Sequence, residues 1–282
     1  MHTISLLVVA LIAFAANSFF CRLALANHAI DPGSFTWLRL VFGATTLLLI
    51  QSWRGHMSYR FFTDKHSWWS GISLFGYAVC FSYAYTQLST GTGALILFGM
   101  VQLTLVVFHV VSGNRLSAKE MLGIGVALSG FTILMLPSAE APSLSAAVLM
   151  LVSGVCWGIF TLLGRQNSVA SVSITQGFIL ASVLAFAASP LLVSIETITT
   201  DGVLWALLSG VFASGFGYIL WYQVVKHISV LQASVSQLAV PVIAFAAGSI
   251  GLGESITPIS VLSCLLVLGG IALIFVAKSK VQ

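Results

Sequence analysis

The sequence predicts an all-α integral membrane protein with ten transmembrane helices, arranged as two inverted repeats of five helices. Three observations lead to this prediction: the composition, the number of apolar runs long enough to cross a bilayer, and a layout in the first half that returns in the second. Hydrophobic residues make up 59% of the 282 residues and charged residues only 6%. This composition leaves too little polar surface for a water-soluble protein of this length.

A helix needs about twenty apolar residues to cross the hydrocarbon core, and each half of the chain has five such runs. In the first half, residues 1–137, the expected helices are Ile4–Leu25, Phe35–Trp53, Trp68–Leu88, Thr90–Val111 and Ala118–Leu136. In the second half, residues 138–282, they are Leu144–Leu163, Ser171–Ser194, Gly202–Lys226, Val230–Gly251 and Ile259–Ala277. Turn-forming residues such as Asp31-Pro32-Gly33 separate the runs.

The segment Leu88–Leu134 of the first half has the same layout as Ile228–Ile274 of the second. In each copy a Leu/Ile-Ser start leads into an apolar run, then a short break at Gly113 or Gly253, then a second apolar run. The two copies share few identical residues, so the equal lengths and breaks carry the inference of two related halves. Because each half has an odd number of spans, the second half must be inserted upside down relative to the first.

The Lys and Arg residues predict the orientation. With a cytoplasmic N-terminus, nine of them lie at cytoplasmic loops or helix ends and none lies in an outer loop. This asymmetry follows the positive-inside rule, places both termini in the cytoplasm, and explains the net charge of +4 without a nucleic acid partner. The nine residues are Arg54, Arg60, Lys65, Arg115, Lys119, Arg165, Lys226, Lys278 and Lys280.

Two charged residues lie well inside the apolar runs: Arg22 in the first run and Arg39 in the second. A charge at this depth is costly and usually faces the bundle interior or a cavity, so both are candidates for a binding site. The alternative is that each long side chain reaches the lipid headgroups from the outer end of its helix. Glu254, which precedes Pro258 in an outer loop, is expected to cap the helix that follows.

Uncharged polar and aromatic side chains inside the runs supply further candidates. Helical i, i+4 spacing puts Trp157 with Thr161 and Tyr218 with Tyr222 on shared faces. Hydrogen bonds between helices and aromatic packing are the structural alternatives for these residues. Aromatic walls with few amide groups suit an amphipathic organic molecule better than an inorganic ion. The candidate binding residues are Asn17, Arg39, Tyr83, Gln102, Trp157, Tyr218, Tyr222 and Gln232.

Several types of site are missing from the sequence. It has no Gly-rich phosphate loop, no metal-ligand spacing, and no Ser/His/acid set at one membrane depth. We therefore expect no cofactor, no metal and no enzyme activity. All seven acidic residues map to loops or helix ends, which favours facilitated diffusion or exchange over proton coupling. The alternatives are that a loop acid folds into the cavity or that the substrate itself carries the proton.

Several short motifs resemble the drug/metabolite transporter superfamily, specifically its EamA-type members. Trp-Gly is usual in that family where this chain has Ala16-Asn17, and a Pro is usual at Val101. The motifs that carry the resemblance are Ala16-Asn17-Ser18-Phe19, Trp37-Leu38-Arg39, Gly113-Asn114-Arg115-Leu116, Gly253-Glu254-Ser255-Ile256, Gly130 and Gly269-Gly270.

The resemblance implies a central cavity lined mainly by the first, third, fourth, sixth, eighth and ninth helices. It also implies a secondary transporter of the bacterial inner membrane that exports a small organic metabolite, such as an amino acid, by alternating access. Two other classes remain as alternatives: a non-transporting membrane receptor or assembly protein, and an intramembrane enzyme acting on lipid. The sequence makes no prediction of the oligomeric state.

Overall fold

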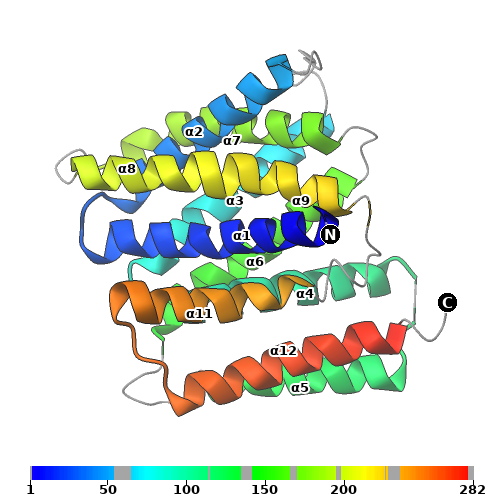
Figure 1. Cartoon of the computed structure of the whole chain (residues 1–282). Helices are drawn as coiled ribbons and strands as arrows, with labels where there is room; N and C mark the ends of the chain where they lie inside the picture. Colours follow the sequence, from blue (N-terminus) through cyan, green and yellow to red (C-terminus); the bar gives the residue numbers. More distant parts are fainter. Residues whose placement is uncertain are drawn as a thin grey trace.

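Figure 1 shows the computed structural model, which describes residues 2–53, 65–113, 115–134, 142–165, 170–194, 198–225, 227 and 236–278. In these residues every regular element is a helix. The first half contains α1 (His2–Ala26), α2 (Pro32–Trp53), α3 (Lys65–Tyr85), α4 (Thr90–Val111) and α5 (Ala118–Leu134). The second half contains α6 (Leu144–Arg165), α7 (Ala170–Leu192), α8 (Thr200–Leu208), η3 (Ser209–Phe216), α9 (Gly217–Val225), α11 (Ala239–Leu252) and α12 (Pro258–Lys278).

The helices agree with the expected spans to within a few residues. Among the described residues, α1, α2, α4, α6, α7 and the segment Thr200–Trp221 are long and apolar enough to cross a membrane, while α11 and the segment Pro258–Ile274 of α12 form shorter apolar stretches. The all-α membrane class is therefore confirmed, and ten crossings remain a prediction. The first part of the expected helix Val230–Gly251 lies outside the described residues.

One expected helix has a different form. The run Gly202–Lys226 was expected as a single α-helix, but the structure places the π-helix η3 between α8 and α9 within one continuous rod. A π-helix closes i→i+5 hydrogen bonds, a choice that hydropathy does not encode. Gly210 lets this rod lie against α2, because a Cβ there would come within 2.6 Å of the Arg39 carbonyl oxygen.

The break at Gly113 and the break at Gly253 share the same local structure. Both glycines have positive φ angles, 88° and 66°, which glycine adopts at little steric cost. Ser117 and Thr257 then cap α5 and α12. Each hydroxyl oxygen accepts from the backbone N–H three residues later, at 3.3 Å and 3.1 Å. The layout found in the sequence thus extends to the backbone.

The packing of the helices is also symmetric. The helix α3 packs on α6 and α7, just as the α8–α9 rod packs on α1 and α2. The pairs α2–α7, α4–α11 and α5–α12 also pack together, as do α4–α6 and α1–α11. The equivalent helices of the two halves are α1 and α6, α2 and α7, α3 and the α8–α9 rod, α4 and α11, and α5 and α12. Exchanging each helix for its equivalent leaves this set of pairs unchanged.

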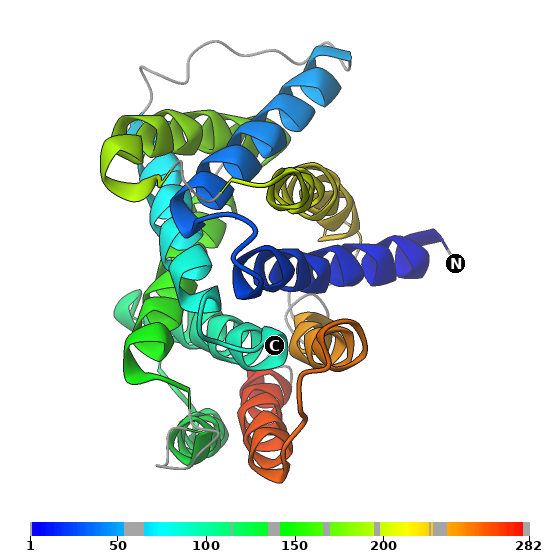
Figure 2. The ribbon, with the colours of Figure 1, turned by 90° about the vertical axis from the view of Figure 1, so that its left-hand side faces the viewer.

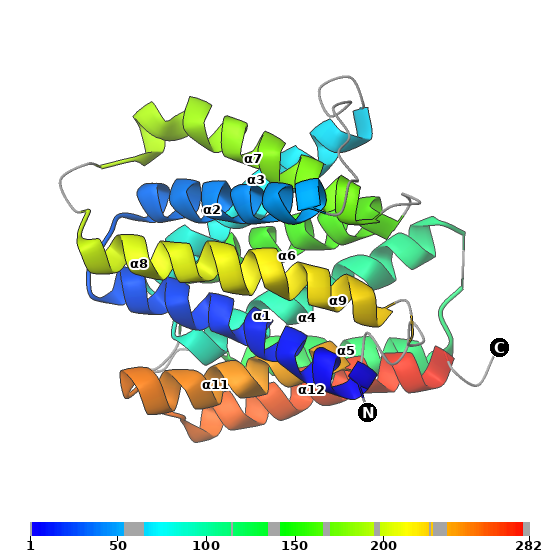
Figure 3. The same ribbon diagram turned by 45° about the horizontal axis from the view of Figure 1, so that its top comes forward.

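The views from other directions show how the bundle is arranged. Figure 2 shows α5 and α12 together at one side of the bundle, away from α2 and α7. Figure 3 shows that α1 begins and α12 ends at the same end of the molecule. Large apolar side chains such as Leu191 and Ile250 are almost fully exposed, at 89% and 87%. An apolar outer surface of this kind suits contact with lipid.

Candidate functional site

A small cavity lies between α1, α3, α4, α6 and the η3–α9 part of the rod. The volume open to the centre of a water molecule is about 20 Å³, which is room for about one water. Organic ligands usually occupy pockets of roughly 300 Å³ or more, so the cavity is too small to hold one in this structure. Its lining residues are Phe14, Asn17, Ser18, Tyr77, Phe81, Leu97, Phe98, Trp157, Ala213, Ser214 and Tyr218.

Aromatic rings from four helices form the wall of this cavity. The ring of Trp157 lies 4.6 Å from that of Tyr77 and 5.2 Å from that of Tyr218, between centroids. Tyr218 in turn forms an edge-to-face pair with Phe14, with 5.7 Å between the ring centroids. Tilted and edge-to-face pairs at these distances are favourable arrangements for aromatic rings. The wall therefore joins α6, α3, α9 and α1 around one space.

Asn17 is the polar centre of the site. Its Nδ2 donates to the Tyr77 hydroxyl at 3.0 Å, and its Oδ1 accepts from Ser209 Oγ at 2.6 Å and from Arg39 Nη1 at 3.3 Å. An amide oxygen has two lone pairs, so both are in use. One amide on α1 thereby orients side chains from α2, α3 and η3.

Arg39 lies directly behind the cavity wall. It is 2% exposed, and its guanidinium carbon lies 5.1 Å from the Tyr77 ring centroid and 4.8 Å from that of Phe81. These are cation–π distances. The Nε atom has no hydrogen-bond partner, and no carboxylate of the described residues lies within 4.0 Å. Arg39 therefore does not reach towards headgroups, which was the alternative left open by the sequence.

The structure brings some of the predicted residues together and separates others. Asn17, Trp157 and Tyr218 line one cavity. Gln102 is 1% exposed on α4, and neither its Nε2 nor its Oε1 has a partner, but it is not among the lining residues. Tyr83 is not among them either, and its hydroxyl donates to the Leu192 carbonyl oxygen at 3.2 Å.

Two other candidates lie outside the described part of the chain: the Tyr222 side chain and Gln232. The sequence argument also missed lining residues that a signal could have found. Tyr77 and Phe81 are an aromatic i, i+4 pair on α3, the same pattern that selected Tyr218. Ser18 and Ser214 have no comparable signal, because serine is common throughout the apolar runs.

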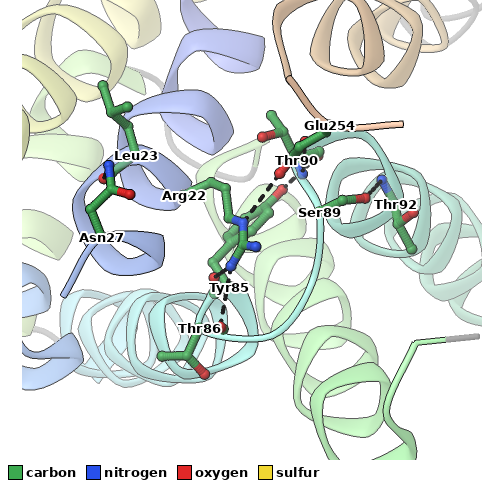
Figure 4. Close-up of polar contacts among 9 residues, drawn as sticks. All are labelled: Arg22, Leu23, Asn27, Tyr85, Thr86, Ser89, Thr90, Thr92 and Glu254. Atoms are coloured by element: carbon green, nitrogen blue, oxygen red, sulfur yellow. Dashed lines mark hydrogen bonds and ion pairs between the residues drawn. The ribbon is translucent and has the colours of Figure 1, made fainter. Parts of the chain in front are cut away.

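A second polar cluster lies at the end of the bundle where α11 ends and α12 begins, which we name the Glu254 end (Figure 4). Arg22 Nε lies 3.2 Å from Glu254 Oε1, and Arg22 Nη1 donates to the carbonyl oxygens of Tyr85 and Thr86 at 3.0 Å and 3.2 Å. The other carboxylate oxygen of Glu254 accepts from the Thr90 N–H at 2.8 Å. This cluster joins α1, the α3–α4 connection and the α11–α12 connection.

The expected capping role of Glu254 is therefore correct in kind but wrong about the helix. Glu254 was expected to cap the helix that begins at Pro258, whereas it caps α4, whose first residue is Thr90. The left-handed conformation of Gly253 ends α11 immediately before Glu254. A carboxylate at a helix N-terminus accepts an otherwise unpaired N–H and is favoured by the helix dipole.

Comparisons with known proteins agree with this architecture. An uncharacterized protein of Pseudomonas aeruginosa is 45% identical over 98% of this chain and 96% of its own length. A probable amino-acid metabolite efflux pump of Salmonella typhimurium is 25% identical over 71% of this chain and 72% of its own length. A probable terminal-alkyne amino-acid exporter of Streptantibioticus cattleyicolor is 24% identical, covering 70% of this chain and 68% of its own length.

A solved crystal structure has the same fold. It superposes with a TM-score of 0.68 over 96% of this chain and 98% of the other, at 19% identity. The model of the EamA-like transporter family matches residues 1–136 and residues 144–276. The two matches cover both halves found in the sequence. The chain therefore belongs to the EamA-like transporter family.

Proposed function

We propose that this chain is a secondary carrier that exports an amino acid or a related small organic metabolite across the bacterial inner membrane by alternating access. In this proposal ten rods cross the membrane as two inverted five-helix repeats, residues 1–137 and 138–282, with both termini in the cytoplasm. The equivalent glycines and caps in the two halves support the repeat, as does the symmetric set of helix contacts. The names of the Salmonella and Streptantibioticus relatives support the substrate class.

The observation that carries the proposal is the position of the cavity between the repeats. Asn17 and Tyr77 come from the first repeat, while Trp157 and Tyr218 come from the second. A site shared by inverted repeats can open to either side as one repeat rocks against the other. We propose Asn17, Trp157 and Tyr218 as contacts of the transported molecule. Roles for Tyr83, Gln102, Tyr222 and Gln232 remain predictions.

The Glu254 end is the periplasmic end in this proposal. Arg22 lies one helical turn beyond Ser18, a lining residue, on the same helix. The pair between Arg22 and Glu254 thus holds the periplasmic side closed, and release to that side requires the pair to separate. The small cavity must also widen before a metabolite can enter it.

Counterflow into proteoliposomes tests the proposal. Purified protein is reconstituted into vesicles that contain one unlabelled compound, and uptake of the same compound in labelled form is followed. The measurement is repeated for each member of a panel of amino acids, keto acids and amines. We expect flux above empty vesicles for at least one amino acid. The control is Leu191→Ala, a change to an exposed side chain on the outer surface, which should keep the flux. Binding of a metabolite without any flux would favour the receptor alternative.

A further inference from the structure

Arg39 carries a buried charge that nothing in the described chain neutralises. It is the largest of the fully buried side chains. Where both partners are described residues, the only ion pair is the one between Arg22 and Glu254. A guanidinium keeps its proton in proteins, so burial cannot make Arg39 neutral. A buried charge is normally paired with an opposite charge, because the loss of hydration is otherwise uncompensated.

The contacts of Arg39 only partly replace that hydration. Arg39 makes one hydrogen bond to Asn17, at the long distance of 3.3 Å, and its Nε has no partner. The rings of Tyr77 and Phe81 add cation–π attraction, which is weaker than a paired carboxylate. A planar guanidinium can bind a carboxylate through two parallel hydrogen bonds, and the Nε of Arg39 is free for one of them.

The same residues that hold Arg39 also line the cavity. Asn17, Tyr77 and Phe81 contact the guanidinium and also line the cavity, whereas Arg39 itself is not a lining residue. If Asn17 releases Arg39, its amide keeps its bonds to Ser209 and Tyr77. A carboxylate entering the cavity can therefore replace one hydrogen bond of Arg39 without dismantling the polar centre.

We propose that Arg39 is the anion-binding group of this carrier and that it selects molecules with a free carboxylate. The carboxylate lies against Arg39, and the remainder of the molecule lies along the aromatic wall formed by Trp157, Tyr218 and Phe14. The favoured ligand is thus a monocarboxylate with an apolar or aromatic side group. This inference rests on the proposed carrier function and adds the charge that the ligand must bear.

The test compares matched ligands for binding, which does not depend on flux. Thermal stabilisation of the detergent-purified full chain is measured with L-phenylalanine, L-phenylalaninamide, 3-phenylpropionate and phenethylamine, which differ in carboxylate and amine groups. We expect the two carboxylates to bind about 10- to 100-fold more tightly than the two compounds without one, since hydrogen bonds to charged groups are the stronger kind. Inorganic phosphate tests for a general anion site, and stabilisation by phosphate equal to that by carboxylates would overturn the selectivity.

Two variants separate the role of Arg39 from folding. Arg39→Met removes the charge while keeping much of the volume, and it should abolish the preference for acid over amide. Asn17→Asp supplies an internal carboxylate 3.3 Å from the guanidinium at nearly unchanged shape. This variant should melt at a higher temperature than the wild type and also lose the preference. Arg115→Met is the matched control, because it makes the same chemical change at an exposed arginine away from the cavity, and it should keep the preference.

The outcomes distinguish this inference from the proposed function. If the metabolites bind and are transported but acid and amide are equivalent, the assignment of Arg39 is overturned and the carrier function stands. A preference for the acid that persists in folded Asn17→Asp or Arg39→Met protein would also overturn it. If no compound of the wider panel binds or is transported, the proposed function itself fails.

Discussion

The strength of the closure at the Glu254 end can be tested by changing one atom of Glu254. In Glu254→Gln the amide oxygen can still accept from the Thr90 N–H, but the ion pair with Arg22 is lost. The two side chains are 20% and 16% exposed. We therefore expect the stabilising free energy of the pair to lie between that of a surface salt bridge and that of a buried charge-assisted hydrogen bond. We assign it about 1 kcal/mol. Glu254→Ala also removes the cap of α4, which adds about 1 kcal/mol.

These energies translate into populations of the open form, because every 1.4 kcal/mol is about a tenfold change in an equilibrium. Opening at this end should therefore become about 5-fold more frequent in Glu254→Gln and about 30-fold more frequent in Glu254→Ala. Cys21 reports on this opening. It is completely buried, next to Arg22 on α1 and one turn from the lining residue Asn17.

The assay is the rate of Cys21 alkylation by a membrane-impermeant maleimide added at the Glu254 end of reconstituted protein. All proteins in this assay carry alanine at Cys80, Cys156 and Cys264, because these partly exposed cysteines could also be alkylated. Asp201→Asn is the matched control, since it makes the same chemical change to an exposed acid in the first turn of α8. Equal alkylation rates in wild type and Glu254→Ala, with the fold intact, would refute the idea that this cluster closes the path.

Three further predictions concern the cavity and the driving force. Trp157→Ala and Tyr218→Ala should lower counterflow while expression and folding stay close to wild type; retained flux with a lower melting temperature would assign the residue to packing. Gln102→Leu should raise stability by about 1–3 kcal/mol in denaturant unfolding, because it removes a buried amide without partners, and loss of flux in this stable variant would show that the amide contacts the metabolite. An imposed pH gradient without membrane potential should cause no uphill accumulation in proteoliposomes; accumulation that a protonophore and Glu254→Gln both abolish would contradict uncoupled transport.

The helices themselves were predictable because membrane insertion is encoded locally. An apolar run of sufficient length forms its hydrogen bonds internally, so composition and length suffice to find it. For the same reason Asn17 and Arg39 could be singled out as polar groups in an apolar environment. The structure confirms that both are buried within the bundle.

The partners of these residues were not predictable from one sequence. Glu254 caps α4, which lies 164 residues earlier in the chain, and no local pattern identifies a cap supplied from such a distance. Arg39 could be placed at a depth in the membrane, but its contacts with Tyr77 and Phe81 depend on how α2 and α3 are packed. The π-helical form of η3 likewise has no signal in the apolar run Gly202–Lys226, which hydropathy describes in the same way as its neighbours.

The π-helix allows the rod formed by α8, η3 and α9 to change its internal twist without ending. Ser209 at the start of η3 is bonded to Asn17, while Tyr218 lies just after its end. If η3 returned to α-helical bonding, the number of residues per turn between these two points would change. Each residue of an α-helix contributes about 100° of rotation and 1.5 Å of rise. Such an exchange would change the orientation of the Tyr218 ring relative to Ser209. A rearrangement of hydrogen bonds within eight residues would therefore be enough to change the part of the cavity wall that Tyr218 forms.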